Sequence, residues 1–271
     1  MKETLKNSGF WPFIRDTYIS IRDLPQLPGA YLHPWRRTAI ERLSELKDIH
    51  RGKRAFIIGN GPSLKQTDLG KLKNEITFGM NRIYLMFPEL GFKTTYLSVV
   101  NSLVIEQTAE DLASLDIPKF ISWRSHPCFD ASLFENRQDP KLPTFLYTTY
   151  DSPRFSTDVR GRVWEGATVT YVTMQLAFHM GFEEVILLGV DHNYSTTGTP
   201  NTTITSEGDD PNHFSSQYFG KGFRWQLPDL ETSEMAYRMA RQSYEKAGRR
   251  ILDGTVGGKL TIFDKIDFNQ L

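Results

Sequence analysis

The sequence predicts an α/β fold, namely a Rossmann-like, doubly wound and mostly parallel sheet, and three observations lead to it. Short apolar runs without alternation recur from Lys53 onward, as expected of strands covered on both faces. Helical stretches separate most of these runs, which is the pattern of a parallel sheet. The first run, residues 55–58, breaks abruptly into Gly59-Asn60-Gly61-Pro62-Ser63, a turn of the kind at which such sheets bind ligands.

Length and composition limit the class of protein. The chain of 271 residues is long enough to bury a full core, and its 32 Lys and Arg balance 32 Asp and Glu, so no global charge indicates a nucleic-acid binder. The single Cys128 excludes an internal disulfide and a cysteine-based zinc site. No apolar run approaches the roughly 18 residues of a membrane-spanning helix. We therefore expect a cytoplasmic protein, with the inner face of a membrane as a further possibility.

Residues 1–52 are predicted to form an N-terminal extension, and residues 53–271 a nucleotide-binding catalytic domain. Aromatic residues such as Trp11 and Phe13 alternate with prolines, which prevents long regular structure but favours packing against another surface. The main domain, a second copy of the chain and a membrane face all remain open as that surface. Residues 36–50 have apolar spacings of three and predict a helix that ends at Gly52.

The catalytic domain is predicted to contain seven strands. Their ranges are 55–58, 76–80, 95–100, 120–123, 144–147, 185–189 and 251–252. Small residues open a helix at Thr168 that ends at Gly181, and a second helix covers residues 231–247. A polar loop that begins near Ser195 is long enough to be a lid or an acceptor site, although disorder is the alternative.

The turn after the first strand is a candidate phosphate-binding site, because glycines let backbone N–H groups approach an anion closely. It nevertheless lacks both common phosphate fingerprints. Leu64 stands where the dinucleotide motif has its third glycine, and no Gly-Lys-Ser/Thr follows. A tight turn without a ligand therefore stays open.

Polar residues end four of the predicted strands. They are Asn60, Asn81, Asn101 and, after Gly189, Asp191. Because the carboxyl ends of parallel strands share one edge of a sheet, these side chains are expected to converge there. Neutral amides suit a pyrimidine edge, ribose hydroxyls and phosphate oxygens, although each asparagine can also be a helix cap or turn former.

Four further residues each have two possible roles. Thr168 caps its helix or offers its hydroxyl to a phosphate bound at the helix N-terminus. His179 on the same helix is expected to be a core or surface histidine. Asp209 and Asp210 in the polar loop hold Mg²⁺ or form a solvated turn.

Four stretches together carry a family resemblance. They are Ile58-Gly-Asn-Gly-Pro-Ser-Leu64, Asn81, Val100-Asn-Ser-Leu-Val-Ile-Glu-Gln107 and Met180-Gly-Phe-Glu-Glu-Val-Ile-Leu-Leu-Gly-Val-Asp191. In this order and spacing they resemble the bacterial lipooligosaccharide sialyltransferases that use CMP-sialic acid. They also resemble the MptE-like family, which includes archaeal hydroxymethylpterin pyrophosphokinases, and the related motility-associated flagellin glycosyltransferases.

The sialyltransferase resemblance implies a nucleotide site. The first asparagine and the serine of the turn would contact the phosphate and ribose, and the two later asparagines would face the nucleotide and donor sugar. The threonine would contact CMP, and the last glycine and aspartate would border the base and ribose. With the two glycines of the turn, the expected nucleotide-binding residues are Gly59, Asn60, Gly61, Ser63, Asn81, Asn101, Thr168, Gly189 and Asp191.

Three residues are candidates for catalysis. Glycosyl transfer to a hydroxyl needs a general base, and a histidine with a pKa of about 6.5 suits neutral pH. His213 lies roughly where the resemblance implies the catalytic histidine, although it can also be a surface loop residue. His192 is the next candidate, or it stacks on the nucleotide. The sialyltransferases have tyrosines after the aspartate that aid the departing phosphate, and Tyr194 takes that role only if the loop shifts.

We therefore expect a glycosyltransferase that moves a sialic-acid-like (nonulosonate) sugar from a CMP-sugar donor to a glycan or related acceptor. No cofactor and no metal site are expected for this reaction. One alternative is an MptE-like pyrophosphokinase that transfers diphosphate from ATP to a pterin-like alcohol and requires Mg²⁺. The other is a non-catalytic, nucleotide-binding accessory protein of polysaccharide assembly.

Overall fold

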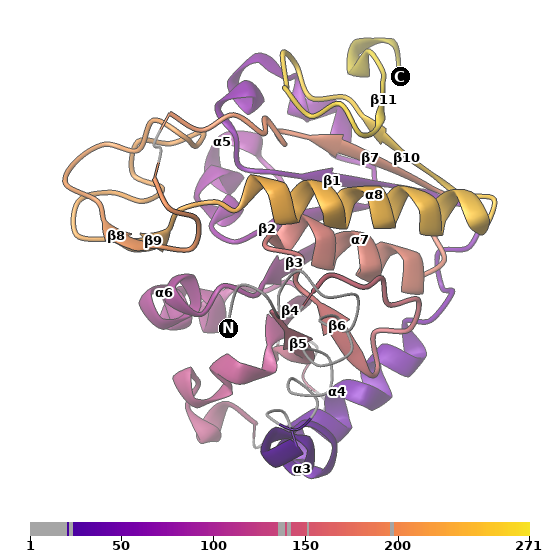
Figure 1. Ribbon diagram of the computed structural model, residues 1–271, viewed down its shortest axis with the longest axis vertical. Coiled ribbons are helices and arrows are strands. Elements are labelled where there is room, and N and C mark those ends of the chain that lie inside the picture. Colours follow the sequence, from indigo (N-terminus) through magenta and orange to yellow (C-terminus); the bar gives the residue numbers. More distant parts are fainter. Residues whose placement is uncertain (1–20, 22–23, 135–138, 140–141, 151, 196–197) are drawn as a thin grey trace, which may run out of the picture.

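The computed structural model describes residue 21 and residues 24–134, 139, 142–150, 152–195 and 198–271. Residues 1–20, 22 and 23 of the N-terminal extension, with Trp11 and Phe13 among them, lie outside the described residues. The described chain forms a nine-stranded sheet flanked by helices, together with a small antiparallel hairpin (Figure 1). The predicted α/β class is therefore confirmed.

All nine strands of the large sheet pair in parallel. Their order is β11-β10-β7-β1-β2-β3-β4-β5-β6. The strand bounds are β1 Arg54–Ile58, β2 Thr77–Met80, β3 Tyr96–Val99, β4 Lys119–Ser122, β5 Thr144–Thr149, β6 Arg162–Trp164, β7 Glu184–Leu188, β10 Arg250–Asp253 and β11 Asp264–Lys265. The strand order reverses between β1 and β7, and this is the place where open parallel sheets bind ligands.

The seven predicted strands are all present, each within two residues of its expected bounds. Strands β6 and β11 were not predicted, because segments of three and two residues are too short to show periodicity. The hairpin of β8 Thr203–Thr205 and β9 Arg224–Gln226 was also missed, since its residues are largely polar.

The described helices cover both faces of the sheet. Their bounds are α3 Leu27–Leu32, α4 Pro34–Glu45, α5 Phe87–Leu90, α6 Ser102–Ser114, α7 Val169–His179 and α8 Leu230–Lys246. In Figure 1, α8 crosses in front of the strands with α7 beside it. Helix α7 lies between α8 and the sheet and is buried almost all round, including His179, whose Nε2 lies 2.7 Å from the carbonyl oxygen of Leu43. The expectation of a core histidine is confirmed.

Helix α4 ends earlier than predicted, at Glu45 instead of residue 50. Beyond it the chain is tied to the end of α7, because the main-chain N–H groups of Asp48 and His50 donate to the carbonyls of His179 and Met180. The fully buried Arg36 on α4 donates to the carbonyl of Phe145 on β5 at 2.7 Å. The described part of the N-terminal extension therefore packs on the sheet domain.

Residues 198–229 of the polar loop after β7 fold into a compact segment that contains the hairpin of β8 and β9. Its aromatic side chains at Phe214, Tyr218, Phe219 and Trp225 are buried. The loop projects from the sheet edge and meets α6, where Arg224 forms an ion pair with Glu106 (Figure 1).

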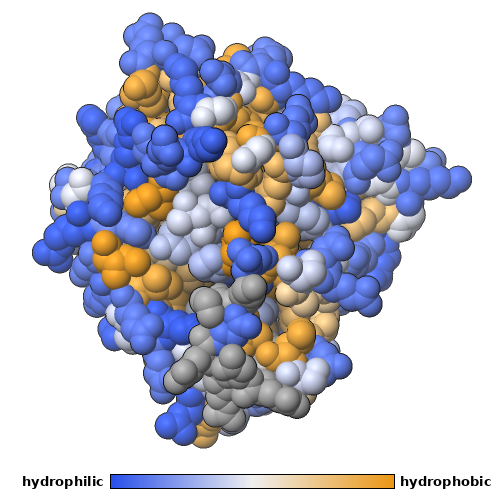
Figure 2. Space-filling view, turned by 180° about the vertical axis from the view of Figure 1, so that it is seen from behind, coloured by the Kyte–Doolittle hydropathy of each residue, from blue (hydrophilic) through white to orange (hydrophobic). Residues whose placement is uncertain are grey.

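Among the described residues, no helix is both long enough and apolar enough to cross a membrane. Figure 2 shows the face opposite to that of Figure 1, where hydrophobic side chains gather in separate patches among hydrophilic ones.

Candidate functional site

A pocket of about 460 Å³ opens at the carboxyl edge of the sheet, where the strand order reverses. The ends of β1, β2, β3 and β7 form its floor, and the loop of residues 198–229 borders it. The N-terminal caps of three helices also reach it, namely Asn101 of α6, Thr168 of α7 and Asp229 of α8. The pocket has the size of a typical small-ligand site.

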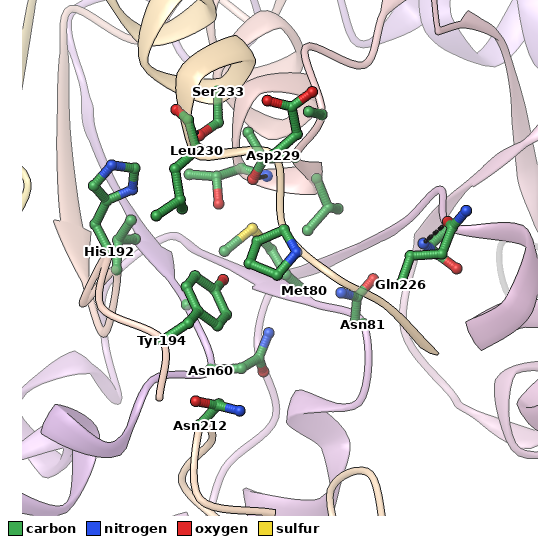
Figure 3. A pocket seen from close by; sticks show the side chains of 18 of the residues that line it. Asn60, Met80, Asn81, His192, Tyr194, Asn212, Gln226, Asp229, Leu230 and Ser233 are labelled. Atoms are coloured by element: carbon green, nitrogen blue, oxygen red, sulfur yellow. Dashed lines mark hydrogen bonds between the residues drawn. The ribbon is translucent and has the colours of Figure 1, made fainter. Parts of the chain in front are cut away.

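The predicted site residues converge on this pocket. With the single exception of Ser63, all of them line it, namely Gly59, Asn60, Gly61, Asn81, Asn101, Thr168, Gly189, Asp191, His192, Tyr194 and His213. Figure 3 shows the side chains of Asn60, Asn81, His192 and Tyr194 arranged around one hollow. The inference from strand ends to a shared edge is therefore confirmed as geometry, while the part each residue plays in binding stays a prediction.

Two asparagines present buried amide oxygens that have no hydrogen-bond partner among the residues that the structure describes. These are Oδ1 of Asn60, at the end of β1, and Oδ1 of Asn81, at the end of β2. Asn81 also has a φ of 49°, a left-handed conformation that asparagine tolerates. A buried acceptor left unpaired costs about 1–3 kcal/mol, so a ligand that brings hydroxyl or N–H donors would satisfy both oxygens.

Asn101 is placed differently from these two. Its Oδ1 accepts from the main-chain N–H groups of Leu103 and Val104 at 3.0 and 3.2 Å, so it caps α6. Its Nδ2 donates to Oε1 of Gln226 on β9 at 3.2 Å, which Figure 3 marks as a dashed line. Asn101 is therefore a helix cap, the alternative predicted for it. Its side chain also links α6 to the hairpin.

The glycine turn after β1 does not offer its amides to an anion as expected. The N–H groups of Gly59 and Gly61 donate to the carbonyls of Leu188 and Gly189 at 2.7 and 2.9 Å. A Cβ on Gly59 would lie 2.2 Å from the Gly189 oxygen, and one on Gly61 would lie 1.8 Å from a carboxylate oxygen of Asp191. The glycines are therefore required for the close approach of this turn to the loop after β7.

Ser63 and Asp191 bind each other. The N–H and hydroxyl of Ser63 donate to the Asp191 carboxylate at 3.1 and 2.7 Å. Burial raises the pKa of the Asp191 carboxyl. The hydrogen bonds from Ser63 act in the opposite direction and lower this pKa. Because Ser63 does not line the pocket, its expected contact with phosphate or ribose is not supported by its position.

Thr168 caps α7, which is one of the two roles predicted for it. Its Oγ1 accepts from the N–H of Thr170 at 3.2 Å and lies 3.4 Å from the hydroxyl of Tyr237 on α8. Gly166 and Ala167 have φ values of 53° and 59° and turn the chain into the helix. The positive end of the α7 dipole therefore lies in the pocket wall, where it favours an anion.

His213 is held by a buried carboxylate. Its Nδ1 lies 2.7 Å from Oδ2 of Asp210, and its ring stacks on Tyr218 with the ring centres 4.0 Å apart. The Asp210 side chain is only 3% exposed and also accepts from the N–H groups of Asn212 and Phe219. A carboxylate at Nδ1 fixes the ring and leaves Nε2 as the proton acceptor. The alternatives of a surface histidine and of a solvated turn at Asp210 are therefore wrong.

The same contacts bear on Mg²⁺. Both oxygens of Asp210 accept hydrogen bonds from the loop, and Asp209 is exposed. Among the residues that the structure describes, no three His, Cys, Asp or Glu side chains are grouped so that they could hold a metal ion. The Asp210 carboxylate therefore binds the loop and His213, and magnesium binding by this pair stays a prediction.

His192 and Tyr194 follow Asp191 on the loop after β7. Nε2 of His192 lies 3.2 Å from Oε1 of Glu234 on α8, and the residue has a φ of 53°. Burial, with the carboxylates of Asp191 and Asp210 nearby, raises the pKa of the Tyr194 hydroxyl. Tyr194 therefore stays protonated and can donate a hydrogen bond into the pocket.

Two carboxylates were missed as partners of the histidines, Asp210 for His213 and Glu234 for His192. The spacing of three residues between Asp210 and His213 was a visible signal, but the two loop aspartates were interpreted as magnesium ligands or a solvated turn. Glu234 lies 42 residues from His192, so no local pattern connects them. A further acidic residue, Glu165, lines the pocket and pairs with Arg124, and burial raises its pKa.

Comparison with known proteins places the chain in a family. A family model described as 6-hydroxymethylpterin diphosphokinase MptE-like matches residues 33–197. A search of curated proteins found no match. Among solved structures the chain is similar to the MAf glycosyltransferase from Magnetospirillum magneticum AMB-1, with 13% identity and a TM-score of 0.48. That alignment covers 98% of this chain and 43% of the glycosyltransferase, so the chain spans less than half of that protein. Since the family model matches more than half of its length, the chain belongs to the MptE-like family.

Proposed function

We propose that this protein transfers a sialic-acid-like (nonulosonate) sugar from a CMP donor to a hydroxyl of a glycan or related acceptor. The observation that carries the proposal is the pair of His213 and Asp210 on the wall of a pocket whose strand-end amides have unpartnered oxygens. The two halves of this arrangement serve the two substrates of a transfer reaction.

His213 serves the acceptor. With Asp210 at Nδ1, its Nε2 takes the proton from the acceptor hydroxyl, and the hydroxyl oxygen forms a bond to the anomeric carbon of the sugar. The bond from that carbon to the phosphate oxygen breaks, and its electron pair leaves with CMP. General-base catalysis of this kind is worth roughly 10²- to 10⁴-fold in rate.

The amides serve the donor. The unpartnered oxygens of Asn60 and Asn81 accept from ribose or sugar hydroxyls or from a base N–H. The N-terminus of α7 accommodates the single phosphate of a CMP-sugar. Within the described chain, the pocket lining contains no Lys or Arg side chain. This lining favours a donor with one phosphate over a triphosphate, which proteins usually bind with a lysine or arginine.

Diphosphate transfer from ATP to a pterin-like alcohol is the second candidate, and the description of the matching family model favours it. His213 would accept the proton of that alcohol as well, so this residue does not separate the two reactions. The two candidates differ in the nucleotide and in the need for Mg²⁺.

A thermal-shift panel with CMP, CDP, UDP, ATP plus Mg²⁺, and no ligand separates them. A ligand that binds only the folded state adds about 2.7 kcal/mol of stability at a hundredfold excess over Kd. We expect CMP to raise Tm without added metal. A rise only with ATP and Mg²⁺ would replace the glycosyltransferase by the kinase. Nucleotide binding without turnover of any donor would leave the accessory protein.

A further inference from the structure

The pocket contains a second histidine that has its own carboxylate. His192 comes from the loop after β7, whereas His213 comes from the loop between β8 and β9, and both line the pocket. Glu234 of α8 lies 3.2 Å from Nε2 of His192, and the other oxygen of Glu234 accepts from Arg238 at 2.8 Å. Each wall therefore presents an imidazole beside a carboxylate.

The conformation of His192 is also unusual. Its φ of 53° lies in the left-handed region, which costs a non-glycine residue of order 1 kcal/mol or more. Its side chain is only 9% exposed, and its ring packs edge to face on Tyr237 with ring centres 6.2 Å apart. Figure 3 shows the ring beside Tyr194 and Leu230 on one wall of the hollow. Strain of this kind is maintained where the surrounding structure fixes a side chain in a particular place.

A transfer reaction can use two such histidines in different roles. One group takes the proton from the attacking hydroxyl, and the other stabilises the negative charge that grows on the departing oxygen. The carboxylate lies at Nδ1 of His213 but at Nε2 of His192, so the nitrogen without a carboxylate partner is Nε2 in the first ring and Nδ1 in the second. Two differently placed histidines therefore suit the attacking side and the departing side of one reaction.

We infer that His192 is a second catalytic residue, which donates a hydrogen bond as an imidazolium to the phosphate of the bound nucleotide, and that Glu234 positions it. The inference rests on the proposed function, because it takes the departing group to be a nucleoside monophosphate. As the bond between sugar and phosphate breaks, its electron pair moves to the phosphate oxygen, and His192 donates its proton to this oxygen. His213 gains the proton of the acceptor hydroxyl, and both rings return to their starting states by exchange with water.

The charged and titratable groups around His192 come from three segments. Glu234, Arg238 and Tyr237 lie on α8, Asp191 precedes His192 in the chain, and Lys259 donates its main-chain N–H to the Asp191 carbonyl. Among the described residues, Glu234 has a hydrogen-bond contact and Tyr237 a ring contact with His192, and Tyr194 follows two residues later on the same loop.

The experiment measures binding of two probes to the full chain, the methyl ester of CMP and cytidine. The ester has one negative charge that does not change between about pH 5.5 and 8.5, so a pH dependence seen only with the ester reports a protein group that contacts the phosphate. We expect the wild type to lose at least about tenfold in affinity for the ester across this range, and little for cytidine.

The variant His192→Asn removes the charge and keeps a residue that tolerates a positive φ. We expect it to lose the pH dependence for the ester and to bind cytidine like the wild type. His213→Asn is the matched control and should keep the pH dependence. If His192→Asn retains it, or if cytidine binding falls equally, His192 does not contact the phosphate.

Glu234→Gln tests the positioning role. Loss of the opposite charge favours the neutral ring, so the midpoint of the pH dependence should move to lower pH. A purely structural Glu234 would lower Tm and leave the midpoint unchanged.

Failure of the donor assignment is distinguishable from failure of this inference. If the ester of AMP or UMP binds and that of CMP does not, the CMP donor is wrong, and the same comparison then runs with the nucleotide that binds. If none of the three esters binds, both the proposed donor site and the role of His192 are overturned.

Discussion

The turn that follows β1 and the loop that joins β8 to β9 face the same pocket, but they use their hydrogen-bonding groups differently. In the turn, the amides of Gly59 and Gly61 are consumed by contacts to the loop after β7. In the loop, the hydrogen bonds to Asp210 hold the His213 ring and leave its second nitrogen available. The glycine motif, which is the more conspicuous in sequence, holds the turn against the loop after β7, whereas the polar loop presents His213 to the pocket.

The largest effect that can test this comparison is on stability. Gly59→Ala places a Cβ against the main-chain oxygen of Gly189, which cannot move without breaking the contact between the turn and the loop after β7. We expect it to lower the free energy of unfolding by about 3 kcal/mol. Chemical denaturation measures this change. Gly208→Ala is the control, because no atom lies within 4 Å of its added Cβ, and it should be near neutral. If Gly59→Ala is stable but binds nucleotide poorly, the turn contacts the ligand and does not only pack against the loop after β7.

The next effect is on turnover. His213→Ala should lower kcat by roughly 10²-fold or more while nucleotide affinity changes little, because the ring acts in proton transfer. Tm should fall as well, because the buried Asp210 carboxylate loses a hydrogen-bond partner. Asp210→Asn should lower kcat as well, since the ring loses its carboxylate, but it should also lower stability because Asp210 holds the loop. Steady-state kinetics with a working donor and acceptor give both values. Normal turnover of His213→Ala would move the base to His192.

Substitutions of Asn81 and Asn101 test whether each residue binds the ligand or stabilises the fold. Asn81→Ala removes an unpartnered oxygen at the pocket, so it should weaken nucleotide binding by about 1–3 kcal/mol. Asn101→Ala removes the cap of α6, so it should cost about 1 kcal/mol of stability. Calorimetric titration and denaturation separate the two effects. The reverse pattern would exchange the roles of the two residues.

The smallest effect concerns Asp191, which belongs to the scaffold side. Its folded-state pKa is raised, chiefly by burial, so the folded protein binds this proton more tightly than the unfolded chain. Its contribution to stability is therefore complete below the ordinary Asp pKa of about 3.9, and it declines as pH rises through the raised value. The stability of the wild type relative to Asp191→Asn should fall as pH increases from about 3.5 to 7. A rise over this range would mean that the Ser63 hydrogen bonds outweigh burial.

Much of the sheet and the location of the candidate site could be predicted from the order of residues. Seven strands were predictable because buried strands are continuous apolar runs, and Asn60, Asn81 and Asp191 were expected to meet because parallel strands end at one edge. The MptE-like resemblance followed from the same stretches. These features depend on local composition and on strand direction, which the order of residues contains.

Only the tertiary structure decided what each group at that edge does. Whether the amide of Gly61 is free or consumed depends on how closely the loop after β7 approaches, and the approach of Glu234 to His192 joins segments 42 residues apart. Likewise Asn81 and Asn101 have the same side chain at equivalent strand ends, yet one leaves its oxygen unpaired and the other caps a helix. Hydrogen-bond partners depend on distances of a few tenths of an ångström between distant parts of the chain, and the sequence pattern does not specify them.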